Sequence, residues 1–230
     1  MKLLAIDTSG EACSVALLLD EQISSRHVLA PMQQAKSILP MVQELLNSKN
    51  CKVDQLDAIA FGCGPGSFTG VRIGVSVAQG LAFAAQLPMI SISSLAANAQ
   101  GAYEELGWKN ILVAIDARMK EVYWAAYQVL DDGLVHLVGK ESVSPPEELT
   151  QEGNWYGIGN AWSEYPNLIP FKPVDLDTKR LPLATAILSL AKPKYQNQEW
   201  VRASEAIPVY LRDHVAKKMN NQSSSFKKGD

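Results

Sequence analysis

The chain has 230 residues, of which 47% are hydrophobic and 20% are charged. This ordinary globular balance permits a sizeable core, so the chain could form one domain or two similar lobes. The formal net charge of -3 excludes a general basic surface for gripping nucleic acid. The three cysteines are widely spaced and form no CxxC pair, which argues against a disulfide framework or a zinc site and suits reduced thiols in a cytoplasmic protein.

The first thirty residues predict three β-strands in close succession. Their apolar runs are separated by polar turn clusters, and they cover Lys2–Ile6, Cys13–Leu19 and Ile23–Leu29. Strands joined by such short turns favour an antiparallel meander at the start of a sheet. The opening MKLLAIDTSG reaches an acidic residue after a few apolar ones, so we expect no signal peptide.

An amphipathic helix is predicted next, from about Ala35 to Asn47. Apolar residues recur there at spacings of three and four, which is typical of one helix face; they are Ile38, Leu39, Val42, Leu45 and Leu46. Pro40 lacks the amide hydrogen that a helix interior uses, which favours a helix start near Ser37.

The stretch GCGPGSFTGVRIG at residues 62–74 is the most distinctive in the chain. It stands between a short apolar run, Asp57–Phe61, and a long apolar segment, Val71–Ala85, which predicts a strand, a tight turn and the start of a helix. Its glycines allow a positive φ angle or a close backbone approach. Amides at the helix start could face an anion, but the Walker and GxGxxG patterns are both missing. We keep both a packing turn and an anion-contacting loop as interpretations, and favour the first.

The segment Val71–Ala85 is apolar on nearly every face. Such a helix is either buried in a core or covered by another chain. Arg72 and Gln79 interrupt it, which disfavours a membrane span. Two apolar helices in one small lobe favour an interface that both helices form. The expected partner-binding residues on them are Ile38, Leu39, Val42, Leu45, Leu46, Val71, Val75, Ala78, Ala82 and Ala85.

After a seam near 107–110 the chain repeats its opening pattern. An apolar strand that ends in an acid occurs at Asp7 and again at Asp116, which indicates a duplicated lobe. We therefore expect an N-terminal lobe at 1–108, a C-terminal lobe at 109–214, and a disordered lysine-rich tail at 215–230. The remaining expected elements are strands at Pro88–Ile92, Ile111–Ile115, Glu121–Val129, Leu134–Val138 and Asn154–Ile158, helices at Ser94–Glu105 and Leu183–Ala191, and an extended run at Ile207–Leu211.

Two polar turns are candidate ligand sites, because each follows an apolar strand that ends in an acid. Asp7 with Ser9 could hold a metal–phosphate group, and the charged turn at Asp116 and Arg118 is similar. The plainer interpretation is that these side chains satisfy the amides of their own turns. The candidate nucleotide or anion contacts are Asp7, Ser9, Gly66, Ser67, Asp116 and Arg118.

The sequence disfavours metal and nucleophile chemistry. Ser67 is outside a G-x-S-x-G elbow, because Pro65 and Thr69 occupy the glycine positions. No HxxxH or HExxH pair is present, and the three histidines lie far apart in sequence, at His27, His136 and His214.

Three strings of residues carry a resemblance to a known family. IDTSGEACSVAL near the start, FGCGPGSFTGVRIG with VAQGLA after it, and IDARMKEVYWAAY in the second half are similar to the TsaB family, also called YeaZ. The resemblance runs from Lys2 to about Tyr127 and recurs at Pro208–Arg212. It implies an α/β, actin-like ATPase or sugar-kinase-like (ribonuclease H-like) fold of two lobes, with the second lobe reduced.

The resemblance implies a role without chemistry of its own. In this family TsaB pairs with its catalytic paralogue TsaD, which transfers threonylcarbamoyl to the adenosine beside the anticodon in tRNAs that read codons beginning with A. An ATPase, TsaE, joins the pair, and tRNA is reached only through the complex. The pairing surface, also used in homodimers, maps onto the helices at about Ala35–Asn47 and Val71–Ala85. No membrane is involved, and the expected location is the cytoplasm.

The resemblance also bears on cofactors. A TsaD-like transferase holds a metal with two histidines on its first helix, whereas this chain has Gln33 and Gln34 there, and neutral amides ligate such metals poorly. We therefore expect no metal and no cofactor bound by the chain itself, with ATP or ADP an option in the complex. The alternative is an enzyme that hydrolyses nucleotide with Asp7, Ser9 and Asp116. A metallopeptidase is disfavoured by the spacing of the histidines.

Overall fold

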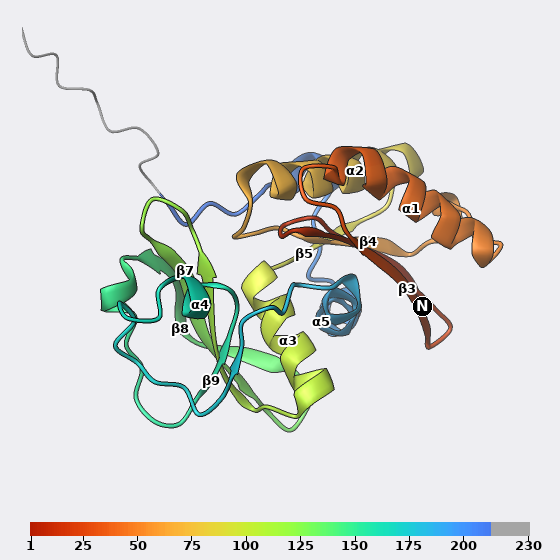
Figure 1. Cartoon of the computed structure of the whole chain (residues 1–230). Helices are drawn as coiled ribbons and strands as arrows, with labels where there is room; N and C mark the ends of the chain where they lie inside the picture. The colour runs from red at the N-terminus through yellow and green to blue at the C-terminus, as the bar shows by residue number, and fades with distance from the viewer. Residues whose placement is uncertain (213–230) are drawn as a thin grey trace, which may run out of the picture.

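The structure is a computed structural model that describes residues 1–212, and it contains two five-stranded sheets with helices packed on them (Figure 1). In the first sheet the order is β3-β2-β1-β4-β5. β1 pairs antiparallel with β2 and β2 with β3, whereas β1–β4 and β4–β5 are parallel. The expected meander is confirmed. The strands are β1 (Lys2–Asp7), β2 (Ala12–Leu19), β3 (Gln22–Leu29), β4 (Ala58–Gly62) and β5 (Met89–Ile92).

The second sheet repeats this topology. Its order, β8-β7-β6-β9-β10, has the same two antiparallel and two parallel pairings as the first sheet. β6 therefore takes the place of β1, and the two strands end at Asp116 and Asp7. This duplicated topology confirms the two-lobe α/β fold. The strands are β6 (Asn110–Asp116), β7 (Val122–Val129), β8 (Val135–Ser144), β9 (Tyr156–Ile158) and β10 (Leu176–Asp177). With β9 and β10 at three and two residues, the second sheet is the reduced one.

The helices form layers on these sheets. α1 (Gln34–Ser48) and α2 (Phe68–Ala85) cover one face of the first sheet and share a hydrophobic core with it. α3 (Ser94–Leu106) and α5 (Ala184–Gln196) lie between the two sheets, in a second core to which both sheets contribute (Figure 1). α4 (Ala161–Glu164) packs on the outer side of the second sheet. Short 3-10 turns occur at Val53–Gln55, Pro146–Glu148 and Ala203–Glu205.

The boundaries of the two docking-candidate helices differ from the prediction. α1 begins at Gln34 and keeps Pro40 inside it, so a start near Ser37 is wrong. Pro40 lies on the exposed side, where the lost amide bond leaves a carbonyl that water can reach. α2 begins three residues before Val71, because the Ser67 side chain caps it by accepting a hydrogen bond from the Gly70 amide at 3.3 Å.

The chain passes between the two lobes more than once. The seam near 107–110 coincides with the end of α3 and the start of β6. However, α5 packs on β1, β2 and β4, so the chain returns to the first sheet well before residue 214. The expected tail at 215–230 and His214 lie outside the described residues.

Candidate functional site

The turn after β1 is closed on itself. The Asp7 carboxylate is buried and accepts hydrogen bonds from the Ser9 amide, at 3.0 Å, and from the Ser9 hydroxyl. The Thr8 hydroxyl donates to the carbonyl oxygen of Gly70 at 2.6 Å, which ties this turn to the start of α2. The interpretation of Asp7 and Ser9 as groups that satisfy their own turn is therefore borne out by these contacts.

The glycine-rich stretch serves the same close packing. A Cβ atom at Gly62 would overlap the Asp7 carboxylate, and one at Gly66 would overlap the backbone of Ser9. Further along α2, a Cβ at Gly74 would lie 2.6 Å from the Thr8 hydroxyl. Only glycine permits so close a backbone approach. The glycines thus let the helix start press against the β1–β2 turn, which is the packing interpretation.

Burial also changes the acidity of Asp7. It raises the pKa of the Asp7 carboxyl to about 7, against which the two hydrogen bonds from Ser9 act only in part. No side-chain cation within the described residues forms a salt bridge with it. The Asp7 carboxyl is thus buried and engaged by its own turn in the isolated chain.

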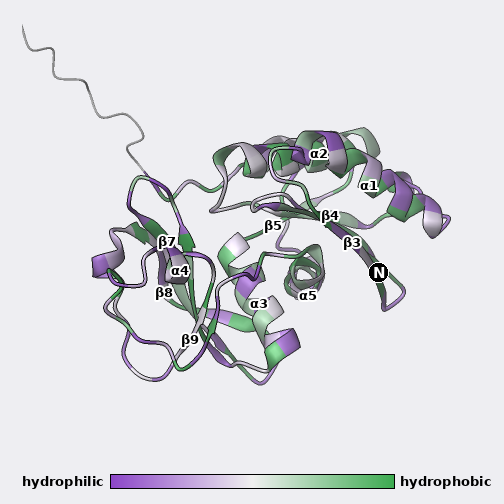
Figure 2. Ribbon diagram, in the orientation of Figure 1, coloured by the Kyte–Doolittle hydropathy of each residue, from purple (hydrophilic) through white to green (hydrophobic). Residues whose placement is uncertain are grey.

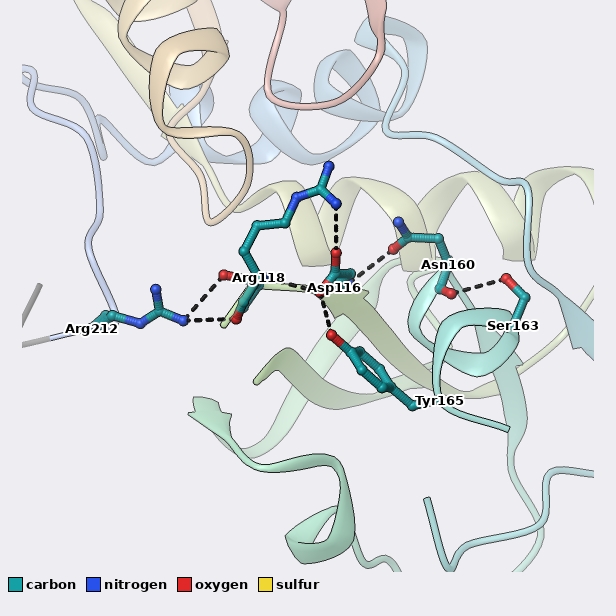
Figure 3. Close-up of polar contacts among 7 residues, drawn as sticks. Asp116, Arg118, Asn160, Ser163, Tyr165 and Arg212 are labelled. Carbon is teal, nitrogen blue, oxygen red and sulfur yellow. Dashed lines mark hydrogen bonds and ion pairs between the residues drawn. The ribbon is translucent and has the colours of Figure 1, made fainter. Parts of the chain in front are cut away.

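The equivalent turn after β6 is also occupied by internal contacts (Figure 3). Asp116 accepts a hydrogen bond from the Tyr165 hydroxyl at 2.8 Å and pairs with the Arg118 guanidinium at 3.2 Å. Its amide donates to the Asn160 side chain at 2.9 Å. Burial and the neighbouring Asp116 carboxylate raise the pKa of Tyr165 to about 12, so the phenol stays a donor. Arg118, by contrast, projects a largely exposed side chain.

In both candidate nucleotide turns the carboxylate is therefore engaged by neighbouring residues. Gly66 and Ser67 lie beside Asp7 and Ser9, as expected, while Asp116 and Arg118 belong to the other lobe. Contact of any of these residues with a nucleotide or anion stays a prediction. Among the described residues no group of three or more His, Cys, Asp or Glu side chains could hold a metal ion.

The two candidate docking helices, α1 and α2, expose a different face from the one expected. Eight of the ten predicted partner-binding side chains are buried in the chain's own core, because they point at the first sheet: Ile38, Val42, Leu45, Leu46, Val71, Val75, Ala78 and Ala82. Assigning those eight to a partner surface is wrong. Leu39, 50% exposed, and Ala85, half-buried, remain on the outside.

The outer face of α2 carries apolar side chains that the sequence reading missed. Phe83 is 76% exposed and Phe68 is 56% exposed, although both are large and apolar. Ile73, Val77 and Leu81 lie half-buried between them. Ile73, Val77 and Leu81 recur every fourth residue along one flank of the buried stripe, whereas Phe68 and Phe83 do not follow that spacing. Figure 2 shows hydrophobic residues along both α1 and α2, with polar residues between them.

Two shallow hollows lie along this face. One, of about 440 Å³, is lined by Ala35 of α1 and by residues of α2 from Phe68 to Val77. The other, of about 360 Å³, lies at the far end of α2 and is lined by Lys52, Val53, Asp54, Leu81, Ala84 and Ala85. Within the described residues, α2 is the one helix whose length and hydropathy would suffice to cross a membrane. One side of it packs in a core, and the other side exposes Phe68, Phe83 and Ala84 beside the polar Thr69, Arg72 and Ser76.

Known proteins match this chain over nearly its whole length. A family model described as "TsaD: tRNA N6-adenosine threonylcarbamoyltransferase" matches residues 23–219. The "tRNA threonylcarbamoyladenosine biosynthesis protein TsaB" of Escherichia coli (strain K12) is 44% identical over 223 residues, which cover 94% of this chain and 96% of that relative. The chain belongs to the TsaD-type family and, within it, to the TsaB family. The TsaB of Haemophilus influenzae is 41% identical and covers 94% of this chain and 95% of its own length.

A solved structure supports the same family. YeaZ from Pseudomonas aeruginosa is 47% identical and superposes with a TM-score of 0.88, covering 91% of this chain and 99% of its own. The resemblance to TsaB expected from the sequence strings is confirmed by these matches. TsaB membership also fits the duplicated topology of the two sheets.

Proposed function

We propose that this chain is the non-catalytic subunit of an assembly that adds threonylcarbamoyl to adenosine beside the anticodon of tRNA. In this proposal it docks on the transferase TsaD, TsaE joins them in the cytoplasm, and tRNA is bound through the complex. The curated relatives are named for threonylcarbamoyladenosine biosynthesis. The observation that carries the proposal is the uncovered apolar face of α2 on a chain whose polar turns are closed by their own hydrogen bonds.

The outer face of α1 and α2 suits a helical partner. Burying a large apolar side chain contributes roughly 1.5–3 kcal/mol, so covering Phe83, Phe68 and Leu39 would supply a substantial part of a binding free energy. The two hollows offer places for side chains of the partner. A second copy of the chain could cover the same face when TsaD is missing, which we propose as the basis of homodimers.

The residues at the start of α1 support a role without metal chemistry. Gln34 is buried, and its side-chain amide donates to the carbonyl oxygen of Gly10 at 3.2 Å. Gln33 and Gln34 stand where, by family resemblance, the transferase keeps metal-binding histidines. A neutral amide engaged in a structural hydrogen bond is a weak ligand for iron or zinc.

The proposed docking face, which is the outer face of α1 and α2 with the exposed Leu39, Phe68 and Phe83, is tested by placing a charge on it. Phe83→Arg should fold with an unchanged melting temperature, because the side chain is 76% exposed, yet it should weaken binding to TsaD by about thirtyfold or more, as for a binding hot spot. Leu130→Arg is a matched control, an exposed apolar residue that follows β7 in the second lobe. Sedimentation of each variant mixed with TsaD measures the affinity.

One outcome of that experiment would count against the proposal. Binding of Phe83→Arg with the affinity of the unaltered chain would contradict the assigned face. Ala78→Arg is unsuited to the same purpose, because Ala78 is fully buried and the change would place an unpaired charge in the core. That variant should lose its cooperative melting transition instead of losing only its partner.

The alternative, a nucleotide-hydrolysing enzyme, rests on Asp7 and Asp116 at the ends of equivalent strands. Both carboxylates are engaged by neighbouring residues, so the isolated chain should show no heat of binding for ATP with magnesium and no phosphate release. Calorimetry and a phosphate assay on the chain alone measure this. Tight binding with turnover would favour the enzyme over the subunit.

A further inference from the structure

The last described residues, Ala206–Arg212, connect the two lobes. Figure 1 shows this blue segment running from beside α2 to the green hairpin formed by β6 and β7. On the first lobe, the side-chain amide of Gln79 in α2 donates to the carbonyl oxygen of Ala206 at 2.7 Å. The Val209 amide then donates to the carbonyl oxygen of Cys63, just after β4, at 2.8 Å.

At the start of α2 this segment is held by side chains. The Arg72 Nε donates to the Tyr210 hydroxyl at 2.8 Å, and its guanidinium lies 3.6 Å from the centre of the Phe68 ring. The rings of Phe68 and Tyr210 are 6.2 Å apart and are both more than half exposed. Phe68 and Arg72 also line the larger hollow on the docking face. The same two side chains therefore belong to the docking face and hold the C-terminal segment.

At its other end the segment holds the β6–β7 turn. The Arg212 guanidinium donates to the carbonyl oxygens of Ala117, at 3.1 Å, and Arg118, at 3.4 Å (Figure 3), and forms an ion pair with Glu121. The three residues at the tip of this turn all have left-handed backbones: Arg118 at φ 61°, Met119 at 56° and Lys120 at 60°. Such angles are strained for residues with a side chain. Arg212 therefore stabilises a turn that the local sequence does not favour.

We propose that Ala206–Arg212 is an interlobe clasp, through which a partner bound on the docking face restrains the β6–β7 turn. A partner that covers Phe68 and Arg72 restrains Tyr210, and Arg212, two residues later, restrains the turn. The partner arm of this inference rests on the proposed function. The clasp itself rests on contacts within the isolated chain.

The clasp is tested by amide hydrogen exchange on the full chain. Arg212→Ala removes the bonds to the turn, and Tyr210→Ala removes the contacts with Arg72 and Phe68 at the start of α2. Both variants should speed exchange at residues 117–121 by roughly ten- to hundredfold, the loss expected for charge-assisted bonds, and leave the amides of β1 unchanged. Arg26→Ala is the control, because it deletes an exposed ion pair with Glu44 elsewhere in the first lobe.

Each result has a definite meaning. Unchanged exchange at 117–121 in Arg212→Ala would overturn the clasp, and an effect of Arg212→Ala without one of Tyr210→Ala would overturn transmission along it. Under saturating TsaD, exchange at 117–121 should slow in the unaltered chain and in Arg26→Ala but not in Tyr210→Ala; equal slowing in all three would overturn the coupling. Failure of the unaltered chain to bind TsaD would overturn the proposed function and the coupling, while the isolated chain still decides the clasp.

Discussion

At the scale of single residues, Asp7 shows how a strand-end acid is used for packing. The sequence makes this acid a candidate ligand for a metal–phosphate group, but in the structure it packs against Gly62 and is bonded to Ser9. The pKa of Asp7, raised to about 7 by burial, is the measurable sign of this enclosure.

The raised pKa predicts a specific pH dependence of stability. An aspartate ionises near pH 4 in the unfolded chain but near pH 7 in the folded one, so between these values the unfolded state binds fewer protons. This carboxyl therefore contributes a loss of stability as the pH rises from 4 to 7, by roughly 2–4 kcal/mol, and no further change above that range. Asp7→Asn removes this pH-dependent contribution to stability.

Denaturant unfolding of the unaltered chain and of Asp7→Asn between pH 4.5 and 8 measures the difference. The variant should gain stability relative to the unaltered chain as the pH rises, because it carries no charge to bury. A difference between the two chains that is constant over this range would show that Asp7 titrates normally.

At the scale of elements, α2 contains glycines of two kinds. A Cβ at Gly70 would overlap the carbonyl oxygen of Thr8, whereas a Cβ at Gly80 would meet no atom within 4 Å. Gly70→Ala should therefore destabilise the isolated chain by about 1–3 kcal/mol, as overpacking does. Gly80→Ala should stabilise it by up to about 1 kcal/mol, because alanine favours the helix. Thermal melting compares them, and equal effects would contradict the packing assigned to the β1–β2 turn.

The elements also show what the sequence could and could not reveal. The strands of the meander and the echo of Asp7 at Asp116 predicted the duplicated topology correctly. The start of α2 was missed, because Gly70 and Gly74 resemble loop residues until the turn that packs on them is known. β10 and α4, of two and four residues, are too short to leave a periodic signal.

The outward face of α2 was beyond sequence reasoning for a different reason. The helix is apolar on both sides, so periodicity alone does not say which stripe meets the sheet. Val75 and Ala78 proved to be inside and Phe83 outside only once the first sheet was placed. Similarly, nothing in the sequence links Arg212 to Glu121, 91 residues earlier, because that contact depends on how the lobes lie together.

At the scale of the whole molecule, the two lobes differ in the surfaces that they present. The first presents an apolar helix face, the second carries the strained β6–β7 turn, and the polar strand ends of both are closed by internal hydrogen bonds. This arrangement suits a subunit that supports a partner and leaves the reaction to it.

Incorporation of threonine into tRNA by TsaD and TsaE, supplied with threonylcarbamoyl-adenylate, tests this division most directly. The unaltered chain and Asp7→Asn should support modification equally well, because Asp7 serves the fold, whereas Phe83→Arg should support little, and the chain without TsaD none. Full modification with Phe83→Arg, or modification by the chain alone that Asp7→Asn abolishes, would contradict the account.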